Sequence, residues 1–366
     1  MKITFVVVDI TAKGGTERTT AVLANTLVKK GHEVHIVSLF KKNESPVFPL
    51  EKDVDILYII DKSYSIHIGP VNRLLLIIQS FFSFRKKFKT GDPDLFIGQN
   101  FLANLFLFFS GSSKKTIACE HSLYAIYPYP ILIFREYVYK SFYALVSLTN
   151  NDADKFRRRL NNVIVIPNML TFKTEEKADL TLKRILSIGR LSYEKGYDLL
   201  LEAVKDIWKE YPDWHLDIWG EGEMYDYLSE KIRVYHLEKN VFLQGYTGDV
   251  VTKYLSSSIY VMPSRYEGFG MVLTEAMSCG LPVVSFDCPD GPVNIIGEDR
   301  GILIPPENIG QLRAGLLSLM GSYDKRKEYA EKGRSFVLQN YNSEVIYEKW
   351  NALFHSFINE RNNINH

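Results

Sequence analysis

The stretch MPSRYEGFGMVLTEAMSCGLPVVS occupies residues 262–285 and predicts a loop, a helix and a strand in that order. The apolar run Ile259–Met262 leads into it and is expected to form a buried strand. We expect the helix to begin near Gly268–Gly270 and to end at Gly280, with Pro282 opening the next strand. Glycines allow a ligand close to the backbone, and a helix N-terminus offers free N–H groups, so this turn is a candidate binding site.

Two carboxylates flank this turn. Glu267 precedes the expected helix N-terminus, and Glu275 follows one to two turns into the helix. An ionised carboxylate accepts hydrogen bonds from two hydroxyl groups at a fixed geometry, so the pair suits sugar and ribose diols. The alternative is structural, with Glu267 as an ordinary first-turn residue and Glu275 facing solvent.

A second informative stretch is RILSIGRLSYEKGYDLL, residues 184–200. Arg190 and Lys195 lie in the expected connection between a strand and a helix, at the carboxyl edge of a sheet where α/β proteins bind ligands. Two cations there can hold a diphosphate and neutralise charge as a glycosidic bond breaks. The alternative is a surface ion pair with Glu194 or Asp198.

Short apolar runs alternate with amphipathic helical stretches through both halves of the 366-residue chain, a pattern typical of α/β folds with parallel sheets. The expected strands are 3–8, 34–39, 56–60, 95–98, 116–119, 144–148 and 163–166 in the first half, and 184–188, 214–219, 241–244, 259–262, 282–285 and 301–304 in the second. A polar stretch after Pro167 interrupts the pattern. We therefore expect one domain over residues 1–167, a second over 168–340, and a terminal helix over 341–366 that crosses back to the first.

The N-terminal 39 residues read as a strand, a Gly-rich turn, a helix and a strand. The turn is Gly14-Gly15-Thr16-Glu17, and a helix N-terminus in this place can bind an anion. The turn also raises the possibility of a Rossmann-type oxidoreductase. That interpretation is disfavoured because the turn lacks Gly-x-Gly-x-x-Gly.

Charge and cysteine content exclude several classes. The 44 Lys and Arg residues balance 43 Asp and Glu residues, so no nucleic-acid partner is expected. Cys119, Cys279 and Cys288 lack zinc spacing and predict reduced thiols in a cytoplasmic protein. Two Asp-x-Asp pairs, Asp92/Asp94 and Asp152/Asp154, are interpreted as structural rather than as a metal site.

One stretch of the first half combines apolar and basic residues. Residues 73–89 carry Leu, Ile and Phe together with Arg85, Lys86, Lys87 and Lys89. Such a helix can lie on an anionic membrane, here the inner face of the cell membrane, although a core helix with a charged end gives the same pattern. Residues 101–109 and 124–139 are candidates to line a groove for an acceptor lipid.

The two stretches quoted above, together with Gly14–Arg18 and Glu120-His121-Ser122, resemble family 4 of the retaining glycosyltransferases. That family has the GT-B fold, in which two Rossmann-like parallel-sheet domains face each other across a cleft. The resemblance is most specific over residues 184–304 and loosest over residues 40–115. It implies an acceptor-binding first domain and a donor-binding second domain.

The resemblance also implies roles for individual residues. Arg190 and Lys195 would bind the donor diphosphate, Glu267 the transferred sugar and Glu275 the ribose. The implied catalytic residues are His121, Arg190, Lys195 and Glu267, and the implied donor-binding residues are Gly15, Gly189, Arg190, Lys195, Glu267, Gly268, Phe269, Gly270, Met271 and Glu275. The nucleotide sugar is then a substrate, and neither a cofactor nor a metal is required.

The expected function is transfer of a hexose or N-acetylhexosamine from a UDP-sugar, rather than a GDP-sugar, to a lipid-linked glycan in surface polysaccharide synthesis (capsule, O-antigen or exopolysaccharide). The alternative is a non-catalytic subunit that binds a sugar nucleotide. One departure from the family pattern is Asn294, which stands where many relatives carry Glu. That change bears on the identity of the sugar or acceptor rather than on the reaction class.

Overall fold

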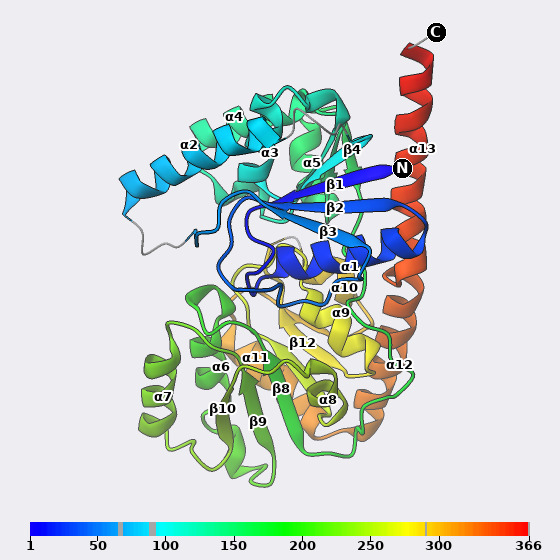
Figure 1. Ribbon diagram of the computed structural model, residues 1–366. Helices are drawn as coiled ribbons and strands as arrows, with labels where there is room; N and C mark the ends of the chain where they lie inside the picture. Colours follow the sequence, from blue (N-terminus) through cyan, green and yellow to red (C-terminus); the bar gives the residue numbers. More distant parts are fainter. Residues whose placement is uncertain (65–68, 88–92, 290, 365–366) are drawn as a thin grey trace. The chain divides into compact units, whose positions relative to one another are not determined.

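The computed structural model describes residues 1–64, 69–87, 93–289 and 291–364 (Figure 1). The chain forms two compact units. The first comprises Met1–Thr171 and Ser343–His366, and the second comprises Phe172–Asn342. The predicted boundaries, after residues 167 and 340, lie close to these divisions.

The first unit is built on a seven-stranded sheet in the order β3-β2-β1-β4-β5-β6-β7, with every neighbouring pair parallel. Its strands are β1 (Lys2–Val7), β2 (Glu33–Ser38), β3 (Val54–Tyr58), β4 (Leu95–Gly98), β5 (Thr116–Glu120), β6 (Ala144–Ser147) and β7 (Val163–Val165). Its helices are α1 (Gly15–Lys29), α2 (Pro70–Lys87), α3 (Phe101–Phe109), α4 (Tyr129–Lys140), α5 (Asn150–Arg157) and α13 (Ser343–Ile364). All seven predicted strands of this half are confirmed.

Helix α13 packs on the first unit, although it follows the second in sequence. The His32 ring, in the turn after α1, meets the rings of Tyr347 and Phe354 edge-on at 6.4 and 5.6 Å. Phe357 packs against the Tyr143 ring at 5.0 Å. Aromatic contacts of this kind bury large apolar areas and hold the terminal helix in place.

The second unit is built on a six-stranded parallel sheet in the order β10-β9-β8-β11-β12-β13. Its strands are β8 (Arg184–Ile188), β9 (His215–Trp219), β10 (Val241–Gly245), β11 (Ile259–Met262), β12 (Val283–Phe286) and β13 (Ile302–Ile304). Its helices are α6 (Tyr197–Val204), α7 (Tyr225–Val234), α8 (Val250–Leu255), α9 (Met271–Ser278), α10 (Pro292–Ile296), α11 (Ile309–Met320) and α12 (Tyr323–Asn340). The six predicted strands of this half are also confirmed. Because all its neighbours are parallel, the carboxyl ends of β8 and β11 lie side by side at one edge of the sheet.

Helix α2 covers the positions of the basic apolar stretch as far as Lys87; Lys89 lies outside the described residues. One side of α2 is buried through Leu76 and Phe84, while Leu75 and Phe82 are exposed. The prediction of a core helix is therefore right for only one face. Within the described ranges, no helix is both long enough and apolar enough to cross a bilayer.

Candidate active site

Two connections of the second unit meet at the carboxyl edge of its sheet. One joins β8 to α6 and includes a short 3-10 turn, Tyr193–Lys195; the other joins β11 to α9. The Lys195 ammonium donates to Glu267 Oε1 and forms an ion pair with it. Ser264 Oγ donates to the same carboxylate oxygen at 3.0 Å. The two stretches that the sequence singled out are therefore in direct contact.

A second ion pair joins the same two connections. Arg265 binds Asp198 through both of its terminal nitrogens, at 2.8 and 2.7 Å, and also donates to the Tyr193 carbonyl at 2.8 Å. Burial opposes ionisation of Asp198, but the Arg265 hydrogen bonds and charge lower the pKa of this carboxyl below its usual value. Asp198 is thus the partner of Arg265 and not of Arg190 or Lys195, which contradicts the surface-pair alternative for that residue.

Glycine is required where the connections touch. Gly196 has φ +66°, and a Cβ atom there would lie 2.0 Å from the Pro263 carbonyl oxygen. Gly270 has φ +90° and directly precedes α9. The Phe269 side chain is buried, with its ring centre 5.5 Å from that of Tyr341. The part of Phe269 that lies at the turn is its backbone. The turn can therefore offer backbone groups to a ligand at close range.

The arrangement leaves positive charge at the surface. Arg190 is exposed, and its guanidinium has no hydrogen bond or ion pair with any residue that the structure describes. The Lys195 and Glu267 side chains are 23% and 12% exposed. A diphosphate placed here would meet two cations and the N-terminus of α9, while Glu267 remains able to accept from hydroxyl groups.

Glu275 occupies a different environment. It lies on α9, is 1% exposed, and accepts a hydrogen bond of 3.0 Å from the Tyr254 hydroxyl. The alternative of a solvent-facing Glu275 is wrong. Its assignment to the ribose stays a prediction.

In the first unit, His121 follows β5 and lies beside Gln99, which follows the neighbouring strand β4. Their side chains are 2.5 Å apart, from Nε2 to Oε1. Gln99 is buried, and burial lowers the pKa of His121 to about 4, so the imidazole is neutral at ordinary pH. With the Gln99 oxygen as acceptor, the His121 proton is on Nε2 and Nδ1 carries the lone pair.

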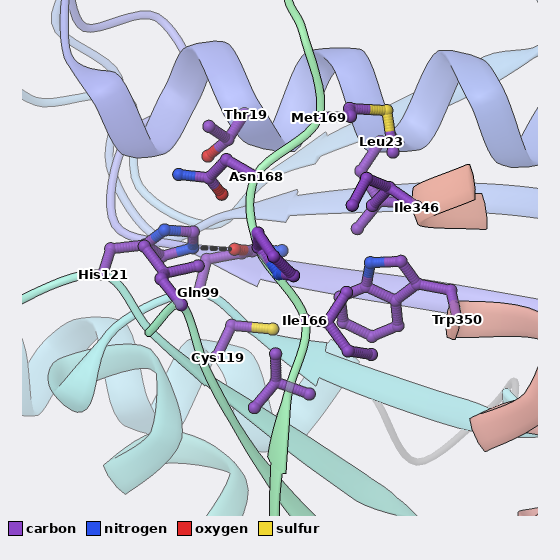
Figure 2. A pocket seen from close by; sticks show the side chains of 13 residues that line it. Thr19, Leu23, Gln99, Cys119, His121, Ile166, Asn168, Met169, Ile346 and Trp350 are labelled. Atoms are coloured by element: carbon purple, nitrogen blue, oxygen red, sulfur yellow. Dashed lines mark hydrogen bonds between the residues drawn. The ribbon is translucent and has the colours of Figure 1, made fainter. Parts of the chain in front are cut away.

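A small cavity of about 30 Å³ adjoins His121 and Gln99, room for a water molecule but not for a sugar. Figure 2 shows these two residues at one end of the cavity, with Ile346 and Trp350 of α13 at the other. Thr19 of α1 also lines it. Gly15 is the first residue of α1 and is exposed, so the predicted phosphate contact lies one turn before Thr19.

The loop that carries His121 rests on a buried ion pair. Glu120 and Arg135 have side chains that are 1% and 0% exposed and meet at 3.3 Å. Glu120 also accepts from the Tyr139 hydroxyl at 2.8 Å and from the Ser122 backbone N–H at 3.2 Å. Arg135 donates to the Tyr124 carbonyl at 2.6 Å. These bonds fix the backbone on the far side of His121.

The Asp-x-Asp residues that the structure describes have structural partners. Asp94 accepts from the Lys2 backbone N–H at 2.9 Å, and Asp152 from the Tyr124 backbone N–H at 3.2 Å. Asp92 lies outside the described residues. Asp94 and Asp152 thus have the contacts that the structural interpretation expects, and the statement that they bind no metal stays a prediction.

Two family profiles match nearly the whole chain. "Glycosyltransferase Family 4" matches residues 13–171 and "Glycosyl transferases group 1" matches residues 169–336. An uncharacterised glycosyltransferase of Haemophilus influenzae is 30% identical over 96% of this chain and 99% of its own length. The chain belongs to the group 1 glycosyltransferases.

Further relatives of this glycosyltransferase agree. The amylovoran biosynthesis glycosyltransferase AmsD of Erwinia amylovora is 29% identical over 96% of this chain and 99% of its own. The crystal structure of a point mutant of S. aureus TarM, in complex with fondaparinux, alpha-GlcNAc-glycerol and UDP, superposes with a TM-score of 0.80. The identity is 17% over 97% of this chain and 100% of that chain. The fold is GT-B, as the sequence resemblance implies. The oxidoreductase alternative is wrong.

Sequence reasoning on this glycosyltransferase missed three supporting residues. Arg265 pairs with Asp198, which lies 67 positions away, so no short-range pattern predicts the pair. Gln99 directly follows a predicted strand, a place where polar residues gather at the ligand edge of a sheet. Arg135 lies in a stretch so rich in apolar and aromatic residues that a buried charge is not expected there.

Proposed function

We propose that this glycosyltransferase is a retaining enzyme that transfers a hexose or N-acetylhexosamine from a UDP-sugar. The observation that supports the proposal best is the contact of Lys195 with Glu267 beside the N-terminus of α9, next to the unpaired Arg190. The two cations suit a diphosphate, and the carboxylate suits the hydroxyls of the transferred sugar. UDP in the TarM complex favours uridine over guanosine as the base.

In the proposed reaction the bond between the sugar C1 and the β-phosphate oxygen breaks, and the electron pair leaves with the phosphate. Arg190 and Lys195 stabilise that developing charge, which is the largest electrostatic change in the reaction. The acceptor hydroxyl attacks the same face of the sugar and passes its proton to the departing phosphate. Glu267 orients the sugar and is not a nucleophile in this scheme, and Lys195 and Ser264 hold its Oε1 in place. No metal ion takes part in this scheme.

Neutral His121 is proposed to contact the donor sugar through Nδ1, and the N-terminus of α1 at Gly15 to contact a donor phosphate. An imidazole with the proton on Nε2 can accept a hydrogen bond from a sugar hydroxyl at Nδ1. A neutral ring avoids competition with the two cations for the diphosphate. The pKa of about 4 supports this role because it keeps the ring uncharged over the physiological range.

The proposed acceptor is a lipid-linked glycan of a surface polysaccharide, presented at the inner face of the cell membrane. AmsD, the relative named for amylovoran biosynthesis, supports the polysaccharide. The membrane is supported by an exposed apolar surface that Leu75 and Phe82 of α2 share with Phe109 of α3 and Tyr137 of α4. Ring contacts between Phe81 and Phe109 (6.3 Å), Phe108 and Phe109 (5.1 Å), and Phe108 and Tyr137 (6.0 Å) make that surface continuous. Basic residues at the end of α2 would meet anionic lipid headgroups.

A donor screen tests the reaction. Purified enzyme is incubated with UDP- and GDP-sugars in the presence of EDTA, and released nucleotide is measured. We expect the wild-type enzyme to hydrolyse, or transfer from, a UDP-sugar. This activity should be lost in Glu267→Ala and kept in Glu331→Ala, the control at an exposed position. If neither the wild type nor the variants release nucleotide from any donor, the non-catalytic subunit becomes the better interpretation. The anomeric proton coupling of the product distinguishes retention from inversion.

Vesicle flotation tests the membrane contact. The protein should float with vesicles that contain phosphatidylglycerol and less so with phosphatidylcholine alone. The double variant Leu75→Ser, Phe82→Ser should stay at the bottom of the gradient, as should a variant with Arg85, Lys86 and Lys87 changed to Gln. Undiminished flotation of both variants would remove α2 from the proposal.

A further inference from the structure

The second sheet has a face that is only partly covered. Side chains alternate along β8, β9 and β10, so that Ile185, Leu216 and Ile218 enter the core while the residues between them point the other way. On that other face the strands and the end of α8 enclose a groove of about 340 Å³, within the size range of small-ligand sites. Its residues are distinct from the donor-site residues described above.

The groove carries more positive charge than its single carboxylate can neutralise. Asp217 is engaged at both oxygens, since Arg184 Nε lies 3.3 Å from Oδ2 and the Gln244 amide donates to Oδ1 at 2.7 Å. The Lys253 ammonium lies 4.5 Å from the centre of the Trp219 ring and has no ion pair within the described part of the chain. Its charge, and the outer nitrogens of Arg184, remain available to an anion.

Aromatic groups lie beside these cations. Phe242 is exposed, and its ring centre is 5.9 Å from that of His215. The C–H faces of a sugar ring are apolar and pack on aromatic rings, while the sugar hydroxyls bond to nitrogen and oxygen atoms around them. A groove with aromatic rings and two cations therefore matches a sugar that carries acidic groups.

We propose that this groove binds an acidic oligosaccharide, namely a carboxylate- or phosphate-bearing segment of the glycan that the enzyme extends. The inference rests on the proposed function for the identity of the glycan. A neutral sugar would leave Lys253 without a counter-charge. Binding here holds the acceptor chain at a point remote from the reacting hydroxyl and raises the local concentration of that hydroxyl near the enzyme.

The test uses the full chain, with saturating UDP present to occupy the donor site. Calorimetric titration compares the sulfated pentasaccharide fondaparinux with the neutral maltopentaose. Wild type should bind fondaparinux at least about tenfold more tightly than maltopentaose, and the double variant Arg184→Ala, Lys253→Ala should lose about tenfold in affinity for fondaparinux. Lys253→Ala alone, which leaves the Asp217 bonds intact, should lose part of it. The control Lys239→Ala, Lys327→Ala makes the same change of net charge at exposed sites and should bind like wild type.

Three results would overturn the proposal. The first is that the wild type and both groove variants bind fondaparinux with equal affinity, and the second is that the control variant loses as much affinity as the groove variant. The third is that sedimentation shows concentration-dependent dimers that disappear in Phe242→Ser. The last would identify the face as a contact between copies. Melting temperatures of all variants show whether the fold is kept. UDP-sugar hydrolysis is measured alongside, and its absence would count against the proposed function while the binding result stands by itself.

Discussion

The two units hold a carboxylate and a cation together in opposite ways. Glu120 and Arg135 in the first unit are almost completely buried, and protein groups fill their surroundings. Lys195 and Glu267 in the second unit are partly exposed, beside an arginine that has no partner among the described residues. A ligand cannot reach a buried pair and replace its bond, so the role of such a pair is to maintain the structure. A partly exposed pair can give up its mutual bond to a ligand at small cost, because water replaces what is lost.

The strongest way to break this comparison is Arg135→Ala. Removal of one partner leaves the Glu120 carboxyl buried without its counter-charge, and the expected loss is about 3–5 kcal/mol of unfolding free energy. Urea denaturation followed by fluorescence measures it. Arg157→Ala removes an exposed arginine that pairs with Asp154 on α5, and it should cost less than about 1 kcal/mol. Similar losses in the two variants would show that burial does not distinguish these pairs.

The reverse pattern is expected for Lys195→Ala. Stability should change little, whereas kcat/KM for the donor should fall about 10²–10³-fold because a stabiliser of the leaving group is gone. Initial rates with the UDP-sugar found in the screen measure this. Lys205→Ala is the matched control, since Lys205 also pairs with a glutamate, Glu202, in the same unit. Wild-type rates in Lys195→Ala would remove this lysine from the proposed mechanism.

Arg265→Met sharpens the comparison from within the second unit. Arg265 pairs with Asp198, and its side chain is more buried than that of Lys195, at 6% against 23% exposed. We expect a loss of about 1.5–3 kcal/mol in unfolding free energy, together with a higher KM for the donor. Arg265→Lys keeps the positive charge, so its loss of stability and its rise in KM should both be smaller than those of Arg265→Met. A loss of stability at unchanged KM would make Arg265 a structural residue only.

The smallest effect is a pH dependence in the first unit. The pKa of His121 is about 4 in the folded state and near 6.5 when the chain unfolds, because burial disfavours the charged ring. The unfolded chain therefore takes up a proton that the folded chain excludes, and stability falls as the pH is lowered from about 6.5 towards 4. Melting temperatures of His121→Gln should fall less steeply over this range than those of wild type. His355→Gln, at an exposed position of α13, is the control and should follow wild type.

Sequence reasoning found the strands, and placed the two quoted stretches after strands of one sheet, because both depend on local pattern. Buried parallel strands are continuous apolar runs, and the connections that follow neighbouring strands must lie at the same sheet edge. Lys195 and Glu267 are 72 positions apart and lie in the loops after β8 and β11, which are neighbours in the sheet. The direct bond between them is a finding of the structure and was not predicted.

What sequence reasoning could not supply is which partner each charge selects. Asp198 binds Arg265 rather than Arg190 because the first turn of α6 faces the loop after β11, a matter of side-chain packing rather than of spacing. Glu275 is buried because Tyr254 of α8 covers it, and nothing near Glu275 in sequence indicates this. For α2, periodicity could not tell that apolar residues face both inwards and outwards.

The division of the chain has a consequence for its synthesis. Residues 172–342 are contiguous and lie between the two segments of the first unit, as an inserted domain does. During translation the second unit is complete once residue 342 has left the ribosome, whereas the first still lacks α13, the helix that covers His32 and Tyr143. Domains fold as their sequences emerge, so the unit that begins the chain is the last to be finished.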